Sequence, residues 1–336
     1  MSSENSPCFD QSNVMAQIDN LPDDLKFNVR INEIMAQFTT LRVGGPADYY
    51  LPVRDRSDFG RAASFAQRAC IPYMILGGGS NACISDKGIR GLVIHNLCAE
   101  ASIGATSDVD CGYSIMKLFQ KSAALSLSGL EFAVGIPGSV GGALVSNAGA
   151  YRQNICDIVE SIDVVENGER KLVGPEWMQF SYRDSRLRQS TETAGALLGV
   201  NLRLQTADRK SILSRARDNQ RQRIFKQPWF PSAGSFFKNV TDTAVAANVP
   251  ELPIALREAG VIPAGFLSAA VGCKGLQFGG AQISVRHGNF VINRGGATAT
   301  DIYDLTREVK RRVLERFGVQ LEEEVMFIGD WSGFEF

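Results

Sequence analysis

Apolar residues recur every three or four positions in two stretches of the N-terminal half, and this spacing predicts amphipathic helices. The first stretch ends near Ala69, with Ser57 or Asp58 as its predicted N-cap, and Pro72 follows it. The second stretch covers 113–125. We therefore expect one helix in each of these segments.

The C-terminal half contains one highly charged segment and one strongly amphipathic segment. Residues 210–225 carry many charges and only sparse apolar positions, so we expect a helix at a domain boundary there. In the second segment, apolar residues recur at helical spacing from Ile302 to Phe317. Asp301 is its predicted cap and Gly318 its C-terminal stop.

Short apolar runs between these helices predict strands. We expect them at 73–76, 91–94, 158–165, 170–173, 196–204 and 319–328. The turn at 166–169 joins two of these strands into a hairpin. No internal repeat or low-complexity tract is evident.

The composition is that of an ordinary globular protein. The chain has 336 residues, of which 44% are hydrophobic and 21% charged, which allows two or three domains with cores of their own. A net charge of −1 gives no reason to expect nucleic acid or an anionic membrane as a partner. Residues 1–30 lack the features of a secretory signal, and we expect a flexible or helical extension there on a cytoplasmic protein.

Cysteine and histidine usage limits the chemistry. The cysteines number seven, are widely spaced and form no CxxC motif, which favours buried thiols in a reducing compartment over disulfides or a zinc site. We expect no metal. The only histidines are His95 and His287, which leave little for a Ser-His-Asp relay, and His287 alone is more typical of a structural histidine.

Two glycine-rich loops are the most informative features. The first consists of Gly77, Gly78, Gly79, Ser80 and Asn81. The second, within 129–151, includes Gly135, Gly138, Ser139, Gly141, Gly142, Asn147, Ala148 and Gly149. Clustered glycine lets backbone N–H groups approach a phosphate, so two such loops predict a ligand with two phosphates held from two sides.

The first loop also resembles a Rossmann fingerprint, because Glu100 lies about twenty residues beyond it. A Rossmann loop must open a helix, however, and 81–90 leaves no room for one before the next predicted strand. A plain tight turn remains an alternative. Neither loop contains GxxxxGK[ST], which argues against a P-loop nucleoside triphosphatase, so a phosphate loop of another fold is favoured.

Two polar motifs are candidates for chemistry. Arg183 lies in a YRDS motif, and taken alone its simpler interpretation is a surface ion pair with Asp184 or Glu176. Ser235 lies among small residues without a histidine nearby. A nucleophilic serine needs a base, so Ser235 is better suited to donate a proton.

A run of three glutamates, 322–324, lies in the last predicted strand. Strand alternation places Glu323 and Glu324 on opposite faces, and the residues that follow are apolar on both faces. A carboxylate at the entrance to a core is desolvated and suits a functional site. Spacing alone does not choose between the two glutamates.

Taken in order, the motifs resemble a known family. The matching stretches are TLRVGGPADYY, ILGGGSN, SGLEFAVGIPGSVGGALVSNAGAY, YRDS, PSAGSFFKN, GGAQIS, HGNFVIN and FGVQLEEEV. From about Phe38 to Gly329 the chain resembles the UDP-N-acetylenolpyruvoylglucosamine reductase (MurB) family, in its shorter type without an inserted loop. The resemblance implies an α+β chain with an FAD-binding fold of the vanillyl-alcohol-oxidase/p-cresol-methylhydroxylase type.

The resemblance also implies a domain plan. After the extension 1–30, an FAD-binding region would cover 38–207, with subdomains at about 38–95 and 96–207. A substrate-binding domain would cover 208–330.

The activity implied by the resemblance has two half-reactions. NADPH reduces non-covalently bound FAD, which then reduces UDP-N-acetyl-3-O-(1-carboxyvinyl)-glucosamine to UDP-N-acetylmuramate. This is a cytoplasmic step of peptidoglycan precursor synthesis, and hence of cell-wall growth, cell shape and division. The implied partner is a UDP-sugar, without nucleic acid or membrane, and a monomer is expected.

Residue roles follow from the motif match. Arg183 would stabilise the enolate, Glu324 would lie beside it as an acid, and Ser235 would donate a proton to the α-carbon. FAD would be bound by the five residues of the first loop, by Arg223, and by Gly138, Ser139, Gly141, Gly142, Asn147, Ala148 and Gly149 of the second loop. The implied substrate-binding residues are Tyr182, Lys226, Lys238, Asn239 and Gln282. Lys238 or a water would polarise Ser235.

The chain departs from the family pattern at four places. Residues 240–259 form a longer segment, Val285 replaces a usual glutamate, Met326 a usual arginine and Cys83 a common leucine. We expect altered surface or cofactor contacts with the chemistry retained.

Two alternatives remain. One is another flavin oxidase or dehydrogenase of the same fold, although such enzymes often tether flavin through histidine or cysteine. The other is a non-enzymatic nucleotide-binding module, which would not need Arg183, Ser235 and Glu324 together.

Overall fold

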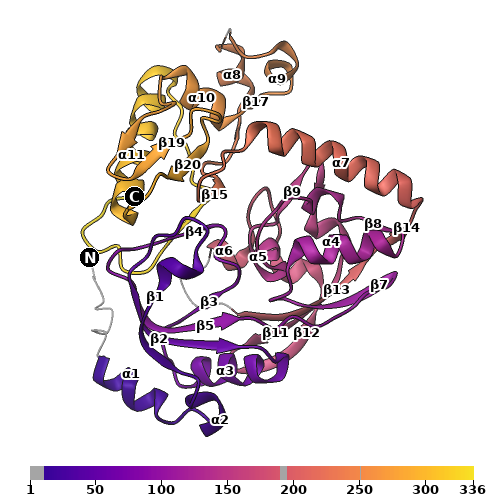
Figure 1. Cartoon of the computed structure of the whole chain (residues 1–336), viewed down its shortest axis with the longest axis vertical. Coiled ribbons are helices and arrows are strands. Elements are labelled where there is room, and N and C mark those ends of the chain that lie inside the picture. The colour runs from indigo at the N-terminus through magenta and orange to yellow at the C-terminus, as the bar shows by residue number, and fades with distance from the viewer. Residues whose placement is uncertain (1–10, 190–194, 250) are drawn as a thin grey trace.

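The structure is a computed structural model that describes residues 11–189, 195–249 and 251–336. Three larger sheets, of four, five and four strands, together with four two-stranded sheets and the helices, make up the described part of the molecule (Figure 1). The N-terminal sheet lies at the bottom of the view, a five-stranded sheet beside it, and the C-terminal part above both. Within the described ranges, no helix combines the length and apolarity needed to cross a membrane.

The N-terminal sheet has four strands. Their order is β1 (Arg30–Ile34), β2 (Pro46–Val53), β5 (Ile89–Asn96) and β3 (Tyr73–Leu76). β2 and β3 run parallel to β5, while β1 runs antiparallel to β2. The chain passes from β2 to β3 through α3 (Arg56–Arg68), whose apolar face is buried in the cluster that includes Leu51 and Ile94.

The helix α3 begins earlier than predicted. Asp55 is its N-cap, and its carboxylate accepts hydrogen bonds from the N–H groups of Ser57 and Asp58. The expectation that Ser57 or Asp58 caps the helix was therefore wrong, because both already lie in its first turn. A side-chain oxygen two or three residues upstream satisfies their free N–H groups.

Part of the expected N-terminal extension packs on this sheet. Helices α1 (Gln11–Ile18) and α2 (Asp23–Lys26) bury Val14, Ile18 and Leu25 against the cluster that holds α3. Residues 1–10 lie outside the described residues.

The second sheet is antiparallel throughout. Its order is β12 (Glu169–Val173), β11 (Val159–Glu166), β13 (Ala196–Arg203), β7 (Thr106–Asp110) and β6 (Ala101–Ser102). The hairpin of β11 and β12 confirms the predicted turn at 166–169. Helix α4 (Ile115–Ala124), predicted at 113–125, shares a core with β7 and β13.

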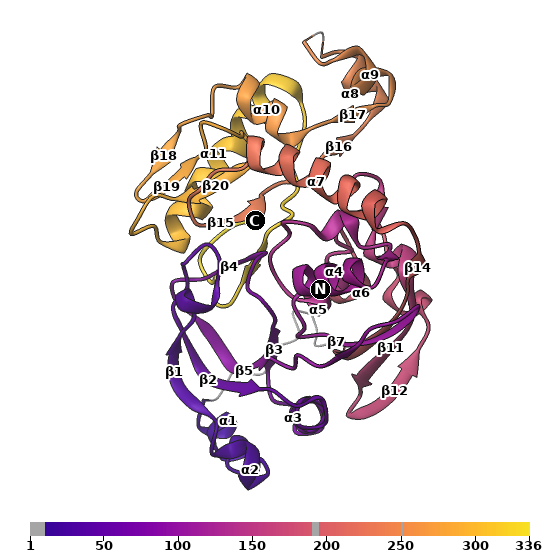
Figure 2. The same ribbon diagram turned by 45° about the vertical axis from the view of Figure 1, so that its right-hand side comes forward.

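A long helix, α7 (Arg209–Lys226), leads to the C-terminal part (Figure 2). There the strands lie in the order β15 (Ser232–Ser235), β20 (Phe290–Asn293), β19 (Ala281–Ile283) and β18 (Gln277–Phe278). They share a core with α10 (Ala264–Ala270) and α11 (Ala299–Phe317).

The predicted N-cap of α11, Asp301, was three residues too late. Thr298 is the N-cap, and Asp301 is the N3 residue of a capping box in which its carboxylate accepts from the Thr298 N–H. Gly318 ends the helix in the left-handed conformation, as predicted.

The segment that is longer than usual in the family forms a small projection at the top of Figure 1. It consists of β16 (Val240–Thr241), α8 (Thr243–Ala247), α9 (Ile254–Glu258) and β17 (Val261–Ile262). β16 and β17 pair at its base.

The last strand is much shorter than predicted. Only β21 (Met326–Ile328) is extended, and it pairs in parallel with β4 (Ala82–Ile84). The prediction of a strand over 319–328 was wrong because the N–H groups of both Glu324 and Val325 donate to Phe236 O. Two successive N–H groups at one carbonyl interrupt the alternation of a regular ladder.

The remaining elements are short. They are η1 (Met35–Phe38), β8 (Leu127–Ser128), η2 (Glu131–Ala133), α5 (Val140–Val145), β9 (Gly149–Ala150), β10 (Gln153–Asn154), η3 (Ile155–Ile158), η4 (Pro175–Met178), α6 (Arg186–Gln189) and β14 (Gln205–Thr206).

The described cysteines are free thiols. Cys83, Cys98, Cys111 and Cys273 are buried, as expected, and Cys156 is half-buried. The expectation of burial was wrong for Cys70, which is exposed where α3 ends. Cys8 lies outside the described residues.

Candidate active site

The two glycine-rich loops meet in the structure. A Cβ on Gly78 would lie 2.6 Å from Gly138 Cα, and a Cβ on Gly138 would lie 2.5 Å from Ser80 Oγ. Ser80 Oγ also donates to Pro137 O at 3.1 Å. The loops therefore form one cradle, and only glycine allows their backbones to come this close.

The first loop leads into a strand rather than a helix. It ends where β4 begins at Ala82, and β5 follows at Ile89. Gly79 has a φ of 58°, and a Cβ there would lie 1.9 Å from Phe38 O. These features confirm that the loop is not a Rossmann turn.

The second loop contains a helix that the sequence did not predict. Ser139 caps α5 by accepting a hydrogen bond from Gly142 N. Val140 N donates to Tyr113 O at 2.8 Å, and Gly141 N donates to Cys111 O at 2.7 Å. The expectation that this loop aims several N–H groups at a phosphate is therefore wrong for these three groups, which bind the protein itself.

Both loops line one cavity of 1440 Å³. The predicted site residues in its wall are Gly77, Gly78, Gly79, Ser80, Asn81, Ser139, Gly141, Gly142, Ala148, Gly149, Arg183, Arg223, Ser235 and Glu324. Gly138 lies directly behind this wall against Ser80. Asn147 is buried and donates to Ser181 O, which fixes the YRDS segment to the second loop.

Arg183 and Glu324 form an ion pair at the cavity. Arg183 Nε lies 3.0 Å from Glu324 Oε1, although the angle does not suit a hydrogen bond. Arg183 also donates to Gly149 O and Asn147 O in the second loop. The simpler interpretation of Arg183 as a surface partner of Asp184 or Glu176 was therefore wrong.

The structure decides between the two glutamates. Glu323 pairs with Lys310 Nζ at 2.8 Å, whereas Glu324 lines the cavity. Burial raises the pKa of the Glu324 carboxyl, and the positive charges of Arg183, Arg188 and Lys238 oppose that rise. A raised pKa favours the protonated form of this acid, which is the form that a proton or hydrogen-bond donor requires.

Ser235 ends the strand β15 in the cavity wall. It pairs with Phe290 of β20 and is half-buried. Lys238, proposed to polarise it, lies 3.6 Å from Asp184 Oδ2 and 3.5 Å from Glu322 Oε2. The structure thus brings the Lys238 ammonium to two carboxylates outside the cavity wall.

Arg223 of α7 lines the cavity beside the second loop. Its guanidinium carbon lies 5.9 Å from the centre of the Tyr151 ring, and its Nη2 donates to Phe132 O. Burial and the nearby charge of Arg183 lower the pKa of Arg223. Its buried Nε has no hydrogen-bond partner among the described residues, which suits it to an anionic ligand.

None of the expected substrate-binding residues lines the cavity wall. Tyr182 is 54% exposed, under the Arg183 guanidinium, and Lys226 is exposed at the end of α7. Asn239 accepts from Ala264 N, and Gln282 donates to Gly275 O.

Several wall residues were not predicted as site residues. Phe290, Cys111 and Asn96 line the cavity, and nothing in the local sequence marks any of them as a cavity residue. Met326 replaces the usual arginine inside the cavity, whereas Val285 is 65% exposed and changes only the surface.

Comparison with known proteins agrees with this geometry. An FAD binding domain family matches residues 47–171, and the family of the UDP-N-acetylenolpyruvoylglucosamine reductase C-terminal domain matches 225–328. The UDP-N-acetylenolpyruvoylglucosamine reductase of Heliobacterium modesticaldum is 37% identical over 90% of this chain and 91% of its own. That of Desulfosudis oleivorans is 38% identical over 90% of this chain and 95% of its own.

A solved structure matches as well. The UDP-N-acetylenolpyruvylglucosamine reductase of Thermus caldophilus superposes with a TM-score of 0.72 at 34% identity, covering 89% of this chain and 99% of the other. Fold and cavity together define an FAD-containing oxidoreductase. The chain belongs to the UDP-N-acetylenolpyruvoylglucosamine reductase family.

The cavity residues fit FAD. Glycines of both loops line the cavity, where bare backbone lets a diphosphate come close, and the unpaired Arg223 Nε offers a donor beside the second loop. The volume exceeds that of a typical drug-sized pocket, as a dinucleotide beside a substrate requires.

Proposed function

We propose that this protein catalyses the NADPH-dependent reduction of UDP-N-acetyl-3-O-(1-carboxyvinyl)-glucosamine to UDP-N-acetylmuramate. The observation that carries the proposal is that Arg183, Glu324 and Ser235 line the same cavity as both glycine loops. These three side chains come from three distant parts of the chain and meet where a flavin would lie.

The roles of the side chains follow from the charge that the reaction creates. FAD held by the two glycine loops and Arg223 would supply the redox chemistry, by passing a hydride from NADPH to the β-carbon of the enolpyruvyl group. The C=C electron pair then moves toward the α-carbon and the carboxylate, which becomes an enolate. Arg183, held by the Asn147 and Gly149 carbonyls, stabilises that developing charge.

A proton completes the reaction. The Ser235 hydroxyl delivers it to the α-carbon, so one hydride and one proton are added across the double bond. Glu324 orients Arg183 through their ion pair and shares the carboxyl end of the substrate with it. The serine hydroxyl recovers its proton from solvent through the open side of the cavity.

The site assignments extend to binding. We infer that the first loop and Gly138, Ser139, Gly141, Gly142, Asn147, Ala148, Gly149 and Arg223 hold FAD. We also infer that Tyr182, Lys226, Lys238, Asn239 and Gln282 contact the UDP-sugar at the cavity rim. In this proposal the protein is a cytoplasmic monomer that contributes to cell shape and division, and its domains follow the boundaries expected from the sequence.

The test separates the two half-reactions. In stopped-flow absorbance, NADPH is mixed with the enzyme first and the enolpyruvyl substrate second. The Ser235→Ala variant is expected to be reduced by NADPH at the wild-type rate but to be reoxidised by substrate about 10³-fold more slowly. Normal reoxidation in this variant would remove Ser235 from the mechanism, and a protein that does not bind FAD would refute the proposal.

A further inference from the structure

Arg188 is a buried cation behind the proposed site. It lies on α6, five residues after Arg183, and its side chain is 10% exposed. Its Nη2 donates to Glu323 O at 3.0 Å, and its Nε lies 4.0 Å from Asp184 Oδ1. Its Nη1 is buried without a hydrogen-bond partner among the described residues. The guanidinium is therefore only partly neutralised, and burial lowers its pKa.

The hydrogen bond to Glu323 O matters because the next residue is Glu324. The backbone here is held from three sides. Arg188 binds the carbonyl before Glu324, Asn81 Nδ2 donates to the Glu324 carbonyl at 2.9 Å, and Glu324 N donates to Phe236 O at 2.7 Å. The direction of the Glu324 side chain depends on these three bonds.

The charges around Glu324 come from every neighbouring element. Arg183 and Arg188 face it from the YRDS segment and α6, and Lys238 faces it from the chain after β15. Other carboxylates near these cations partly neutralise their positive charge. Asp184 and Glu322 pair with Lys238, and Glu323 pairs with Lys310 of α11. Arg188 differs from Lys238 in having no carboxylate closer than 4.0 Å among the described residues.

We propose that Arg188 is a positioning residue for Glu324, acting through the Glu323 carbonyl and through its own incompletely paired charge. The inference rests on the proposed function, because it needs Glu324 to act in reoxidation. Arg188 does not itself line the cavity, and its hydrogen bond to the Glu323 carbonyl connects it to the site next to Glu324.

The sign of the effect does not depend on how Glu324 acts. A nearby positive charge favours the ionised carboxylate, so its removal raises the pKa of Glu324 further. If the acid form is required, the rate falls at a higher pH than in the wild type. If the carboxylate is required, the rate rises at a higher pH. Either limb of the pH profile moves upward.

The test uses the holoenzyme and three variants. Arg188→Met removes the charge and the hydrogen bond, whereas Arg188→Lys keeps the charge and one donor. Arg186→Met is the matched control, because Arg186 lies on the same helix but pairs with Glu166 and stacks on Trp177. Each variant is followed through both half-reactions, and reoxidation by the enolpyruvyl substrate is measured from about pH 5 to pH 9.

Arg188→Met is expected to keep its FAD and to be reduced by NADPH within about twofold of the wild type. Its reoxidation is expected to slow on the order of tenfold, with the limb of the pH profile moved up by about one unit. Arg188→Lys should restore most of the rate, and Arg186→Met should behave as the wild type.

Three results would overturn the inference. They are an unchanged pH profile in Arg188→Met, an equal loss in both half-reactions, and an equal effect of Arg186→Met. Glu324→Gln distinguishes these from failure of the proposed function. If Glu324→Gln reoxidises normally, the role of Glu324 is wrong, whereas if it is slow and Arg188→Met is normal, only the role of Arg188 is wrong.

Discussion

A Cβ atom on Gly78 would lie 2.6 Å from Gly138 Cα, so the two glycine-rich loops touch through bare backbone. The contact brings the end of β3 against the segment that leads into α5. It creates one wall for the cavity from two parts of the chain that lie far apart in sequence. This part of the cavity wall therefore depends on the absence of a side chain at both positions.

Gly78→Ala is expected to push the loops apart and to cost the protein its FAD. The clash involves backbone atoms on both sides, which no side-chain rotation relieves. We expect FAD affinity to fall about 100-fold or more, corresponding to roughly 3 kcal/mol. Gly104→Ala is the control, because a Cβ there would lie 3.4 Å from its nearest neighbour, Thr106 O. The measurement is the FAD content after dialysis, and wild-type content in Gly78→Ala would contradict the packing argument.

Glu324→Gln is expected to affect only the second half-reaction. The substitution keeps the shape but removes the charge that pairs with Arg183. We expect reduction by NADPH to stay near the wild-type rate and reoxidation to slow about 10²-fold. In the wild type, the pH limb assigned to Glu324 should lie above the ordinary glutamate range, because burial raises the pKa of this group. A Glu323→Gln variant, which loses the pair with Lys310 instead, should keep the rate and this limb.

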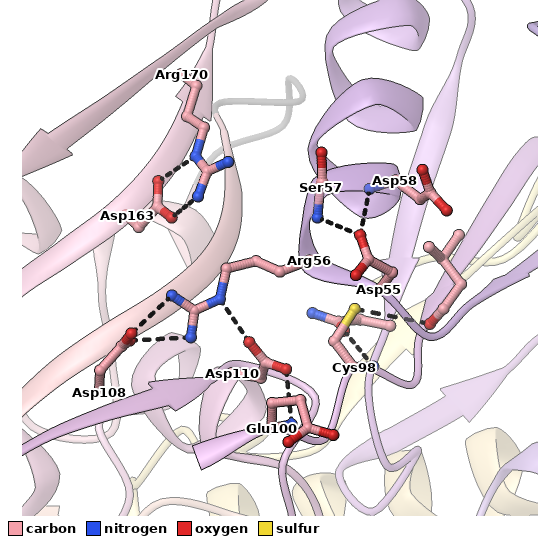
Figure 3. A network of polar contacts seen from close by, with 12 residues as sticks. Asp55, Arg56, Ser57, Asp58, Cys98, Glu100, Asp108, Asp110, Asp163 and Arg170 are labelled. Carbon is pink, nitrogen blue, oxygen red and sulfur yellow. Dashed lines mark hydrogen bonds and ion pairs between the residues drawn. The ribbon is translucent and has the colours of Figure 1, made fainter. Parts of the chain in front are cut away.

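The salt bridge between Arg56 and Asp110 joins the start of α3 to the five-stranded sheet (Figure 3). Asp110 is buried and also accepts from Glu100 N at 2.7 Å, and the next residue, Cys111, holds Gly141 of the second loop. Asp110→Asn leaves Arg56 without its buried partner, so we expect about 3 kcal/mol of lost stability. Asp108→Asn, whose carboxylate pairs with Arg56 at an exposed position, should cost less than about 1 kcal/mol. Urea unfolding of the two variants measures the difference, and equal costs would show that the burial of Asp110 adds nothing.

His95 is expected to make the protein sensitive to acid. Its Nδ1 lies 2.6 Å from Tyr50 Oη in a buried site, and burial lowers its pKa from 6.5 to about 4. The unfolded chain therefore binds a proton at a higher pH than the folded chain does. Stability from this group is complete above about pH 6.5 and declines as the pH falls toward 4, by roughly 3 kcal/mol.

The measurement is the free energy of unfolding at several pH values in the wild type and in His95→Gln. The variant is expected to lose part of the decline between pH 6.5 and 4. His287, whose pKa is also lowered by burial, contributes to the same decline. His287→Asn is therefore a second variant. If the unfolding free energy of His95→Gln depends on pH as in the wild type, the acid sensitivity comes from other groups.

Much of this fold could be predicted from periodicity. The helices α3, α4, α7 and α11 and the hairpin of β11 and β12 lie within a few residues of their predicted ranges. The family, its cofactor and the three candidate catalytic residues came from ordered motifs. The helix caps were missed by two or three residues, because Asp55 and Thr298 compete with other polar residues in the same turn.

The sequence by itself determined the local elements, the glycine content of the loops and the family, because these depend on side-chain spacing and on short motifs. The motif match already implied that Glu324 lies beside Arg183, and the structure shows their ion pair. Only the tertiary structure decided that Glu323 pairs with Lys310 and that Arg188 binds the Glu323 carbonyl. It also decided that the N–H groups of Val140, Gly141 and Gly142 donate hydrogen bonds within the protein. Such contacts depend on long-range packing between segments that are far apart in sequence. They produce no periodic pattern of residues from which they could be predicted.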